Sequence, residues 1–193
     1  ALGHDGRRWT LRAHALLLHR PAGEARPQLY CHREMVVIEH RQPYTADAAV
    51  RAAHISSAGH AKHWPEPYLL DSEDIAAQVR SSIARTFASV WEHLPRGEST
   101  PPEAQLCQVF GVDLTADAHG RVWLLEVNDY PAIASGTMSH VDVGVYTTLV
   151  RDVLRLAVLP LVDGAADGAT PGGFVELDVA AHVVGRAVAA ELC

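Results

Sequence analysis

Two apolar stretches on either side of a His-Gly dipeptide constrain the fold of this 193-residue chain more than any other feature. Residues 105–114 and 121–128 each have the length and apolar content of a buried strand, and they flank His119 and Gly120. Glycine adopts positive φ values without strain, so a two-residue turn is expected at this dipeptide. The sequence therefore predicts an antiparallel hairpin.

A two-residue turn fixes which side chains meet across the hairpin. If Ala118 pairs with Arg121, Asp113 lies directly opposite Glu126, a few ångströms away on the same face of the sheet. Asn128 is two residues beyond Glu126 and points to the same side, because side chains alternate along a strand. The hairpin is therefore predicted to bring two carboxylates and an amide together.

Two carboxylates on one patch of an apolar sheet repel each other unless a cation lies between them. Oxygen ligands suit Mg²⁺ or Mn²⁺, and Mg²⁺ that has few protein ligands completes its coordination with phosphate and water. We therefore predict a metal and phosphate site at Asp113, Glu126 and Asn128. The alternative is that the acids lie at the rim of the sheet and are solvated. Strict alternation also predicts that Trp123 faces away from Glu126.

The rest of the pattern predicts an α+β fold, an antiparallel sheet with helices on one side. Alternating and apolar runs predict further strands over 9–20 and 29–40. Apolar residues at spacings of three and four predict a helix that begins at Asp71 or Ser72, either of which is a suitable N-cap. A second amphipathic helix is expected over 142–159.

Composition divides the chain into three parts. Residues 1–162 are predicted to form the main domain, and DGAADGATPGG at 163–173 has the composition of a flexible linker. Residues 174–193 are expected to form a short strand and a small helix. The chain does not begin with Met, which we interpret as a piece of a longer protein.

Charge and composition exclude several classes of function. The chain has 23 acidic and 16 basic residues and a formal net charge of -7, so general nucleic-acid binding is not expected. No run approaches the roughly 18 apolar residues of a membrane span. The three cysteines have no metal-ligand spacing and suit a reducing, intracellular compartment. The twelve histidines match no zinc signature, so we expect them to be structural or solvent-facing.

Several stretches also resemble a known family. Residues 110–133, FGVDLTADAHGRVWLLEVNDYPAI, resemble the metal-binding hairpin of ATP-grasp ligases. Within that superfamily, RRWTLRAHALLLHR (7–20) resembles a strand of the tubulin-tyrosine ligase-like family. HREMVVIEHRQPY (32–44) and HISSAGHAK (54–62) are similar to that family's next hairpin and loop. The resemblance covers about residues 7–160 and implies the carboxy-terminal half of an ATP-grasp catalytic domain.

The resemblance implies a function and a role for particular residues. The expected Mg²⁺ ligands are Asp113, Glu126 and Asn128. Arg12 is the expected phosphate-facing catalytic residue, and Ser56 and Lys62 are expected to contact the nucleotide. The implied reaction uses Mg·ATP to phosphorylate an acceptor carboxylate, and an amine then forms the amide. The implied acceptor is tubulin or another acidic protein tail, in the cytoplasm or on the cytoskeleton.

Three positions depart from the family pattern. Thr10 stands where the family usually has Asp, Ile38 where it has an active-site Arg, and Ser57 where it has Asn. One alternative is therefore a degenerate pseudoenzyme that serves as a structural or binding subunit of a larger assembly. Another is a different ATP-grasp ligase, such as a ribosomal-protein glutamate ligase or a peptide synthetase, because the hairpin is common to them all.

Overall fold

A computed structural model of the chain describes residues 6–19, 27–54, 66–94, 106–131, 140–163 and 171–182. Within these residues seven strands form one sheet, and each strand pairing is antiparallel. The strands are β1 (Arg7–His19), β2 (Gln28–His32), β3 (Val36–Pro43), β4 (Tyr68–Leu69), β5 (Leu106–Ala116), β6 (Val122–Asn128) and β7 (Phe174–Glu176). The helices are α1 (Glu73–Val90), α2 (His140–Val153) and α3 (Leu159–Asp163), with a π-helical turn, η4 (Leu154–Val158), between the last two. Short 3₁₀ turns are η2 (Arg51–Ala53), η3 (Trp91–His93) and η6 (Ala180–His182).

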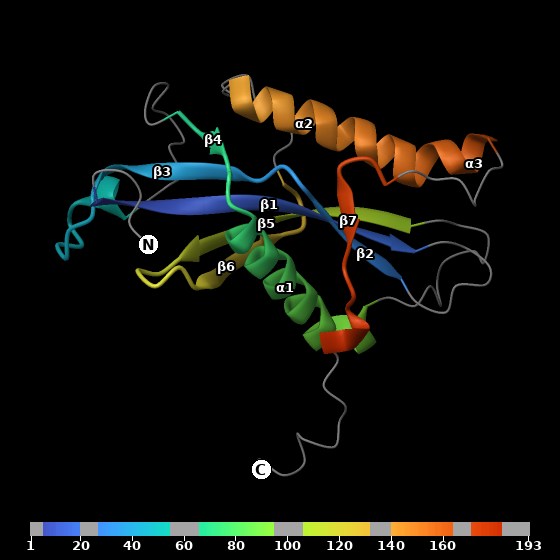
Figure 1. Cartoon of the computed structure of the whole chain (residues 1–193), viewed down its shortest axis with the longest axis horizontal. Helices are drawn as coiled ribbons and strands as arrows, with labels where there is room; N and C mark the ends of the chain where they lie inside the picture. Colours follow the sequence, from blue (N-terminus) through green and yellow to red (C-terminus); the bar gives the residue numbers. More distant parts are fainter. Residues whose placement is uncertain are drawn as a thin grey trace, which may run out of the picture.

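Strand β1 organises the sheet. Along one edge it pairs first with β3 and then with β2, and along the other edge it pairs with β5. Strands β4, β7 and β6 continue the sheet beyond β3, β2 and β5 respectively (Figure 1). The predicted hairpin is therefore β5–β6, and it lies beside the first strand of the chain.

Helices cover both faces of the sheet. Leu11, Ala13 and Ala15 point from β1 into a core with α1, which includes Val79 and Ile83. The side chains that alternate with them reach the other face. There the buried cluster consists of residues from β1, β2, α2, η4 and β7, namely Leu16, Leu18, Tyr30, Leu149, Leu156, Ala157 and Phe174. The predicted α+β fold with an antiparallel sheet flanked by helices is confirmed, but the expectation of helices on one side only is wrong.

Helix α1 begins where the sequence predicts. The Ser72 hydroxyl accepts a hydrogen bond from the Ile75 amide at 3.4 Å, and Glu73 and Asp74 lie in the first turn, where the helix dipole favours negative charge. Its buried side chains, which include Val79 and Phe87, follow the predicted stripe.

The last described strand joins the same sheet. β7 pairs with β2, and Phe174 packs edge-on against Tyr30 and His32. Most of the predicted linker and the small helix expected before residue 193 lie outside the described residues, so the three-part division stays a prediction. No described helix has both the length and the apolar character needed to cross a membrane.

Candidate functional site

The β5–β6 turn differs from the predicted one. The Asp117 amide donates to the Arg121 carbonyl at 2.9 Å, which leaves a three-residue loop, Ala118 to Gly120, with Gly120 at a φ of 75°. The Asp117 carboxylate accepts hydrogen bonds from the amides of His119 and Arg121. Desolvation raises the pKa of Asp117, but these bonds and those from the side chains of Arg121 and Trp123 outweigh it and lower the pKa.

A bulge at Leu125 restores the register that the longer turn would have shifted. Leu114 pairs with Leu124, whereas Asp113 pairs with Glu126, so Leu125 has no partner on β5. The predicted pairing of Asp113 with Glu126 is confirmed. The two-residue turn from which it was predicted is one residue shorter than the observed loop. The bulge also changes the alternation along β6. Trp123 pairs with Thr115 and so lies on the same face as Glu126, contrary to prediction.

Arg12 and Asp113 form a bidentate ion pair across β1 and β5. The two residues are cross-strand neighbours, and Arg12 Nη2 donates to Asp113 Oδ2 at 2.8 Å while Nε donates to Oδ1. The Arg12 side chain is 22% exposed and that of Asp113 is 11% exposed. Hydrogen bonding to Asp113 raises the pKa of Arg12, against the opposing effect of burial. The predicted phosphate contact and the first predicted metal ligand are thus bonded to each other.

The other two predicted ligands lie on β6. Asn128 Nδ2 donates to Glu126 Oε1 at 3.0 Å, which leaves the Asn128 amide oxygen available to a cation. Glu126 is exposed. The structure therefore places Asp113, Glu126 and Asn128 on adjacent strands, with Arg12 on the next strand along.

The donor set suits Mg²⁺ in type, but it supplies only part of the six ligands. In the part of the chain that the structure describes, no group of three or more His, Cys, Asp or Glu side chains could hold a metal ion. A cation here would have two carboxylates and one amide oxygen as protein ligands, and Mg²⁺ commonly accepts such a set when phosphate and water supply the rest. Each Asp113 oxygen accepts one hydrogen bond from Arg12 and keeps a lone pair for a cation.

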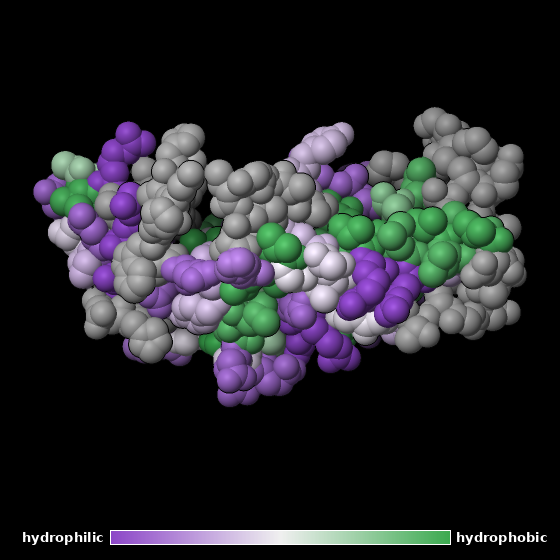
Figure 2. Space-filling model, turned by 90° about the horizontal axis from the view of Figure 1, so that it is seen from above, coloured by the Kyte–Doolittle hydropathy of each residue, from purple (hydrophilic) through white to green (hydrophobic). Residues whose placement is uncertain are grey.

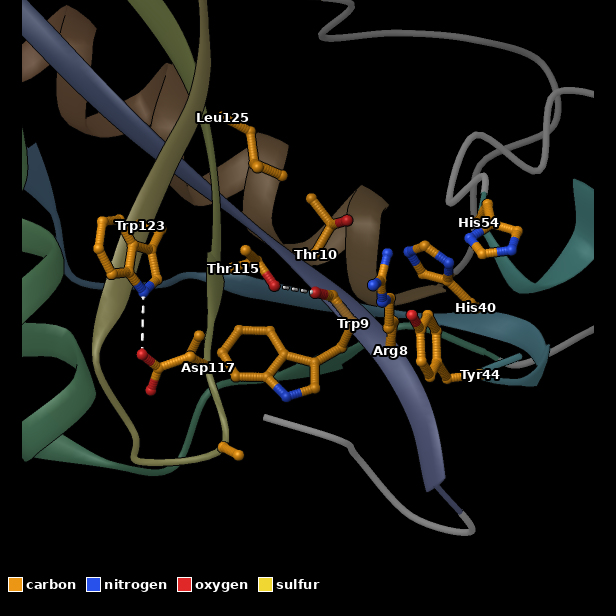
Figure 3. A pocket seen from close by; sticks show the side chains of 12 residues that line it. Arg8, Trp9, Thr10, His40, Tyr44, His54, Thr115, Asp117, Trp123 and Leu125 are labelled. Atoms are coloured by element: carbon orange, nitrogen blue, oxygen red, sulfur yellow. Dashed lines mark hydrogen bonds between the residues drawn. The ribbon is translucent and has the colours of Figure 1, made fainter. Parts of the chain in front are cut away.

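A cavity that the sequence did not predict adjoins this site. It has a volume of about 600 Å³, and Thr10 and Thr115 lie in its wall (Figure 3). They are two residues along their strands from Arg12 and Asp113. The lining residues are Arg8, Trp9, Thr10, His40, Tyr44, His54, Thr115, Ala116, Asp117, Ala118, Trp123 and Leu125. The alternation of Arg8, Thr10 and Arg12 on β1 was the one local signal for it.

One end of the cavity combines cationic and aromatic groups. The Arg8 guanidinium carbon lies 4.1 Å from the centre of the Tyr44 ring, and His54 meets the same ring edge-on at 5.8 Å. Burial lowers the pKa of His40, whose Nδ1 lies 3.1 Å from the Ala53 carbonyl oxygen. The cavity can therefore hold an anionic group at this end and apolar or aromatic groups near Trp123.

Two predicted nucleotide contacts, Ser56 and Lys62, lie outside the described residues, as does Ser57. The other two departures from the family pattern are visible. Thr10 and Ile38 are cross-strand partners on β1 and β3, and Thr10 lines the cavity. The Asp and Arg that the resemblance led us to expect are thus missing from directly opposed positions.

The sequence profile of the tubulin-tyrosine ligase family matches residues 40–165, more than half of the chain. The chain belongs to the tubulin-tyrosine ligase family. It is also 35% identical over 105 residues to the tubulin polyglutamylase ttll-4 of Caenorhabditis elegans. This match covers 51% of this chain and 17% of that protein. Identity to ttll-4 of Caenorhabditis briggsae is 35% over 92 residues, 46% of this chain and 15% of the relative. The matched part of this ligase-family chain thus corresponds to about a sixth of the length of these curated relatives.

Proposed function

We propose that the full-length protein is an ATP-dependent ligase that joins an amino acid to a carboxylate of tubulin or of another acidic protein tail. The observation that carries the proposal is the register of β5 and β6, in which Asp113 lies opposite Glu126 and Asn128 follows on the same face. Membership of the tubulin-tyrosine ligase family and the likeness to two tubulin polyglutamylases support the choice of acceptor.

The proposed reaction has two steps. The γ-phosphoryl group of ATP moves to an acceptor carboxylate, which gives an acyl phosphate and ADP. The amino group of the incoming amino acid then attacks the acyl carbon, phosphate leaves with the bonding electrons, the amine loses a proton, and an amide remains. A bound Mg²⁺, held by Asp113, Glu126 and Asn128, would neutralise negative charge on the phosphates.

Arg12 has a direct part in this proposal. Its guanidinium lies beside Asp113, and turning one or both of its donors from that carboxylate to a phosphoryl oxygen would place a cation where charge develops. Gly111, two residues before Asp113 on β5, lies against this side chain, since a Cβ there would be in van der Waals contact with Arg12 Nη1 at 3.5 Å. The side chains of Arg12, Asp113, Glu126 and Asn128 would together bind and orient the triphosphate.

Metal-dependent nucleotide binding tests the proposal. The full-length protein should bind a non-hydrolysable ATP analogue in titration calorimetry with Mg²⁺ present and much more weakly with EDTA. Glu126→Gln keeps the size of the side chain and removes its charge, so binding should fall by about tenfold or more. Glu176→Gln on β7, an exposed acid at the other edge of the sheet, is the matched control and should bind normally. Equal binding by both variants would rule out Glu126 as a ligand.

The competing function is that of a binding or structural subunit without turnover. It is favoured by the loss of the expected Asp and Arg at Thr10 and Ile38, and by the closed ion pair of Arg12 with Asp113. A subunit of this kind would incorporate no labelled glutamate, glycine or tyrosine into tubulin even when it binds nucleotide. Incorporation that depends on Glu126 would exclude it.

A further inference from the structure

Helix α2 and its continuation carry apolar side chains on two sides. The inner side packs on the sheet through Val145, Leu149 and Leu156, which are at most 2% exposed. The outer side consists of apolar residues that are between 37% and 75% exposed, and we call it the outer stripe: Val143, Val150, Leu154, Val158, Leu161 and Val162. Figure 2 shows apolar side chains over α2 and α3 on this face.

The spacing of the outer stripe is that of a helix-packing seam. From Val143 the steps are seven to Val150, four to Leu154, four to Val158 and three to Leu161, so one line of the helix carries an apolar side chain in almost each turn. A helix with a single solvated face normally presents polar residues there, whereas one that is apolar on both sides is normally covered on both. The stripe therefore has the character of a surface that another helix covers.

Positive charge borders the stripe. Arg151 and Arg155 are 51% and 55% exposed, and both turn toward the one buried carboxylate of Asp152, at 3.2 and 3.9 Å. That carboxylate also accepts a hydrogen bond from the Gly173 amide and faces His32. One carboxylate cannot use all the donors of two guanidinium groups, and a second acid, Glu34, accepts a hydrogen bond from Thr148, so both arginines keep N–H donors for an acidic partner.

We propose that the outer stripe binds an amphipathic helix of another protein, apolar on the face that meets Leu154 and acidic along the border that meets Arg151 and Arg155. The surface lies on the outer side of α2, whereas Arg12 and Asp113 lie on the sheet beneath, so the proposal does not depend on ligase activity. Acidic side chains would gain ion pairs with both arginines, and the apolar side chains of the partner helix would exclude water from the seam.

Charge also favours an acidic helix of another protein over a second copy of the chain or a membrane. A second copy of the chain would bring Arg151 and Arg155 toward the same two residues, and two described acids on this side are already engaged, Asp152 with the arginines and Glu34 with Thr148. An anionic bilayer would meet the net charge of -7 of the chain and a stripe without aromatic or Lys anchors. The chain after α3 returns through β7 to η6, which packs against α1 on the opposite face of the sheet.

The first experiment uses a designed peptide as the probe. A synthetic helix of about 20 residues spans roughly 30 Å, enough to cover the stripe. It has leucines at alternating steps of three and four and glutamates on both flanks, and its control has lysines in place of the glutamates. Fluorescence anisotropy with the full-length protein should show saturable binding of the acidic peptide and about tenfold weaker binding of the lysine peptide.

Matched variants locate the binding surface. Val150 on the stripe and Val90 at the end of α1 are both 43% exposed, so Val150→Glu should weaken peptide binding by about tenfold while Val90→Glu leaves it unchanged. Arg155→Gln should weaken binding by about threefold and reduce its dependence on salt. Circular dichroism verifies folding, and Leu154→Gln replaces Val150→Glu if the latter unfolds.

Four results from the binding and assembly measurements would overturn the proposal. They are equal binding of the two peptides, equal binding by Val150→Glu and Val90→Glu, a dimer in sedimentation that Val150→Glu dissolves, and binding to phosphatidylserine vesicles that Val150→Glu abolishes. A further check is the labelling of Val150→Cys by a maleimide in the full-length protein without peptide. Rapid labelling that the acidic peptide blocks supports the proposal, whereas a cysteine that is already protected would show that a segment of the same protein covers the stripe.

Discussion

Arg12 and Asp113 are bonded to each other through two hydrogen bonds between neighbouring strands that are 101 residues apart in the chain. The pair joins the predicted phosphate contact to a predicted metal ligand. It uses two of the five N–H donors of Arg12 and one lone pair on each Asp113 oxygen, so both residues keep capacity for a further ligand. Both side chains are largely buried, and an ion pair of this kind is costly to break by removing one partner alone.

The stability of this pair can be measured with a double-mutant cycle. Asp113→Asn and Arg12→Met should each lower the free energy of unfolding by about 2 kcal/mol, because each leaves a polar group of the other residue without its partner. The double variant should lose less than the sum, with a coupling of about 1–2 kcal/mol. Urea denaturation at low salt gives all four values. Additive losses would show that the ion pair does not form in solution.

His14 predicts a distinctive dependence of stability on pH. It is fully buried on β1, and neither ring nitrogen has a hydrogen-bond partner among the described residues. Burial, together with the charge of Arg12, lowers the pKa of His14 to about 3, from a usual value of 6.5. Between these two pH values the unfolded chain binds a proton at His14 and the folded chain does not, so stability falls as the pH is lowered from 6.5 toward 3.

The comparison of wild type with His14→Leu isolates this effect from the other histidines. As the pH falls below 6.5, the free energy of unfolding of wild type should decrease more steeply than that of His14→Leu. The difference in slope should approach about 1.4 kcal/mol per pH unit. Above pH 6.5 the variant should be as stable as wild type or slightly more stable, since it removes two unpartnered nitrogens from the core. Parallel pH profiles from urea titrations would contradict the burial of a neutral His14.

Replacement by Ala is predicted to have opposite effects on stability at two glycines. A Cβ on Gly173 would lie 2.6 Å from His32 Nε2 and 2.8 Å from Asp152 Oδ2, both on buried side chains, so Gly173→Ala should cost about 2–3 kcal/mol. A Cβ on Gly144, inside α2, would meet no atom within 4 Å, so Gly144→Ala should stabilise the protein by about 0.5–1 kcal/mol. Thermal denaturation of the two variants side by side tests both. Similar melting temperatures would show that the turn before β7 is not packed as described.

Local signals in the sequence were sufficient to predict α1. Ser72 is a good N-cap, and apolar residues at spacings of three and four define the face that packs on the sheet. Both features depend on residues a few positions apart, where propensity and periodicity are informative. The same holds for the alternation that predicted β1 and the strands of the hairpin.

The hairpin shows how a correct register can follow from an incorrect turn. The sequence favoured two loop residues because it contains His119-Gly120, but the Asp117 carboxylate accepts hydrogen bonds within the loop and stabilises three. An Asp at the start of such a loop is the signal that was overlooked. The bulge at Leu125 then compensates for the extra residue, and no local rule would have predicted it.

Pairings between distant residues could not be predicted from the sequence. The ion pair of Arg12 with Asp113, the contact of Thr10 with Ile38 and the cavity beside them depend on which strands flank β1. Hydrophobic periodicity gives the orientation of each strand but not the order of strands in a sheet. For the same reason the prediction of helices on one side of the sheet was wrong, since α1 and α2 cover opposite faces.

The last prediction concerns the directly opposed pair of Thr10 and Ile38. Each preorganised cation near a transferring phosphoryl group is typically worth about 10² to 10³ in rate, so the absence of the expected Arg at Ile38 should leave the full-length protein with slow ligation. Ile38→Arg alone should raise that residual activity. Adding Thr10→Asp should raise it further, because Thr10 is buried and a guanidinium next to it needs a carboxylate partner. The assay is incorporation of labelled glutamate, glycine or tyrosine into tubulin.

Thr10→Asp with Ile38→Gln is the matched control for this pair, since it supplies the carboxylate without the cation and should not raise incorporation. Rapid incorporation by the unmodified protein, with a loss of activity in Ile38→Arg, would show instead that another cation has taken over this position. Arg8 is the residue to test in that case, because it lines the same cavity and lies two residues before Thr10 on β1. Arg8→Gln would then abolish the activity, whereas in a slow enzyme that lacks this cation it would leave the residual rate unchanged.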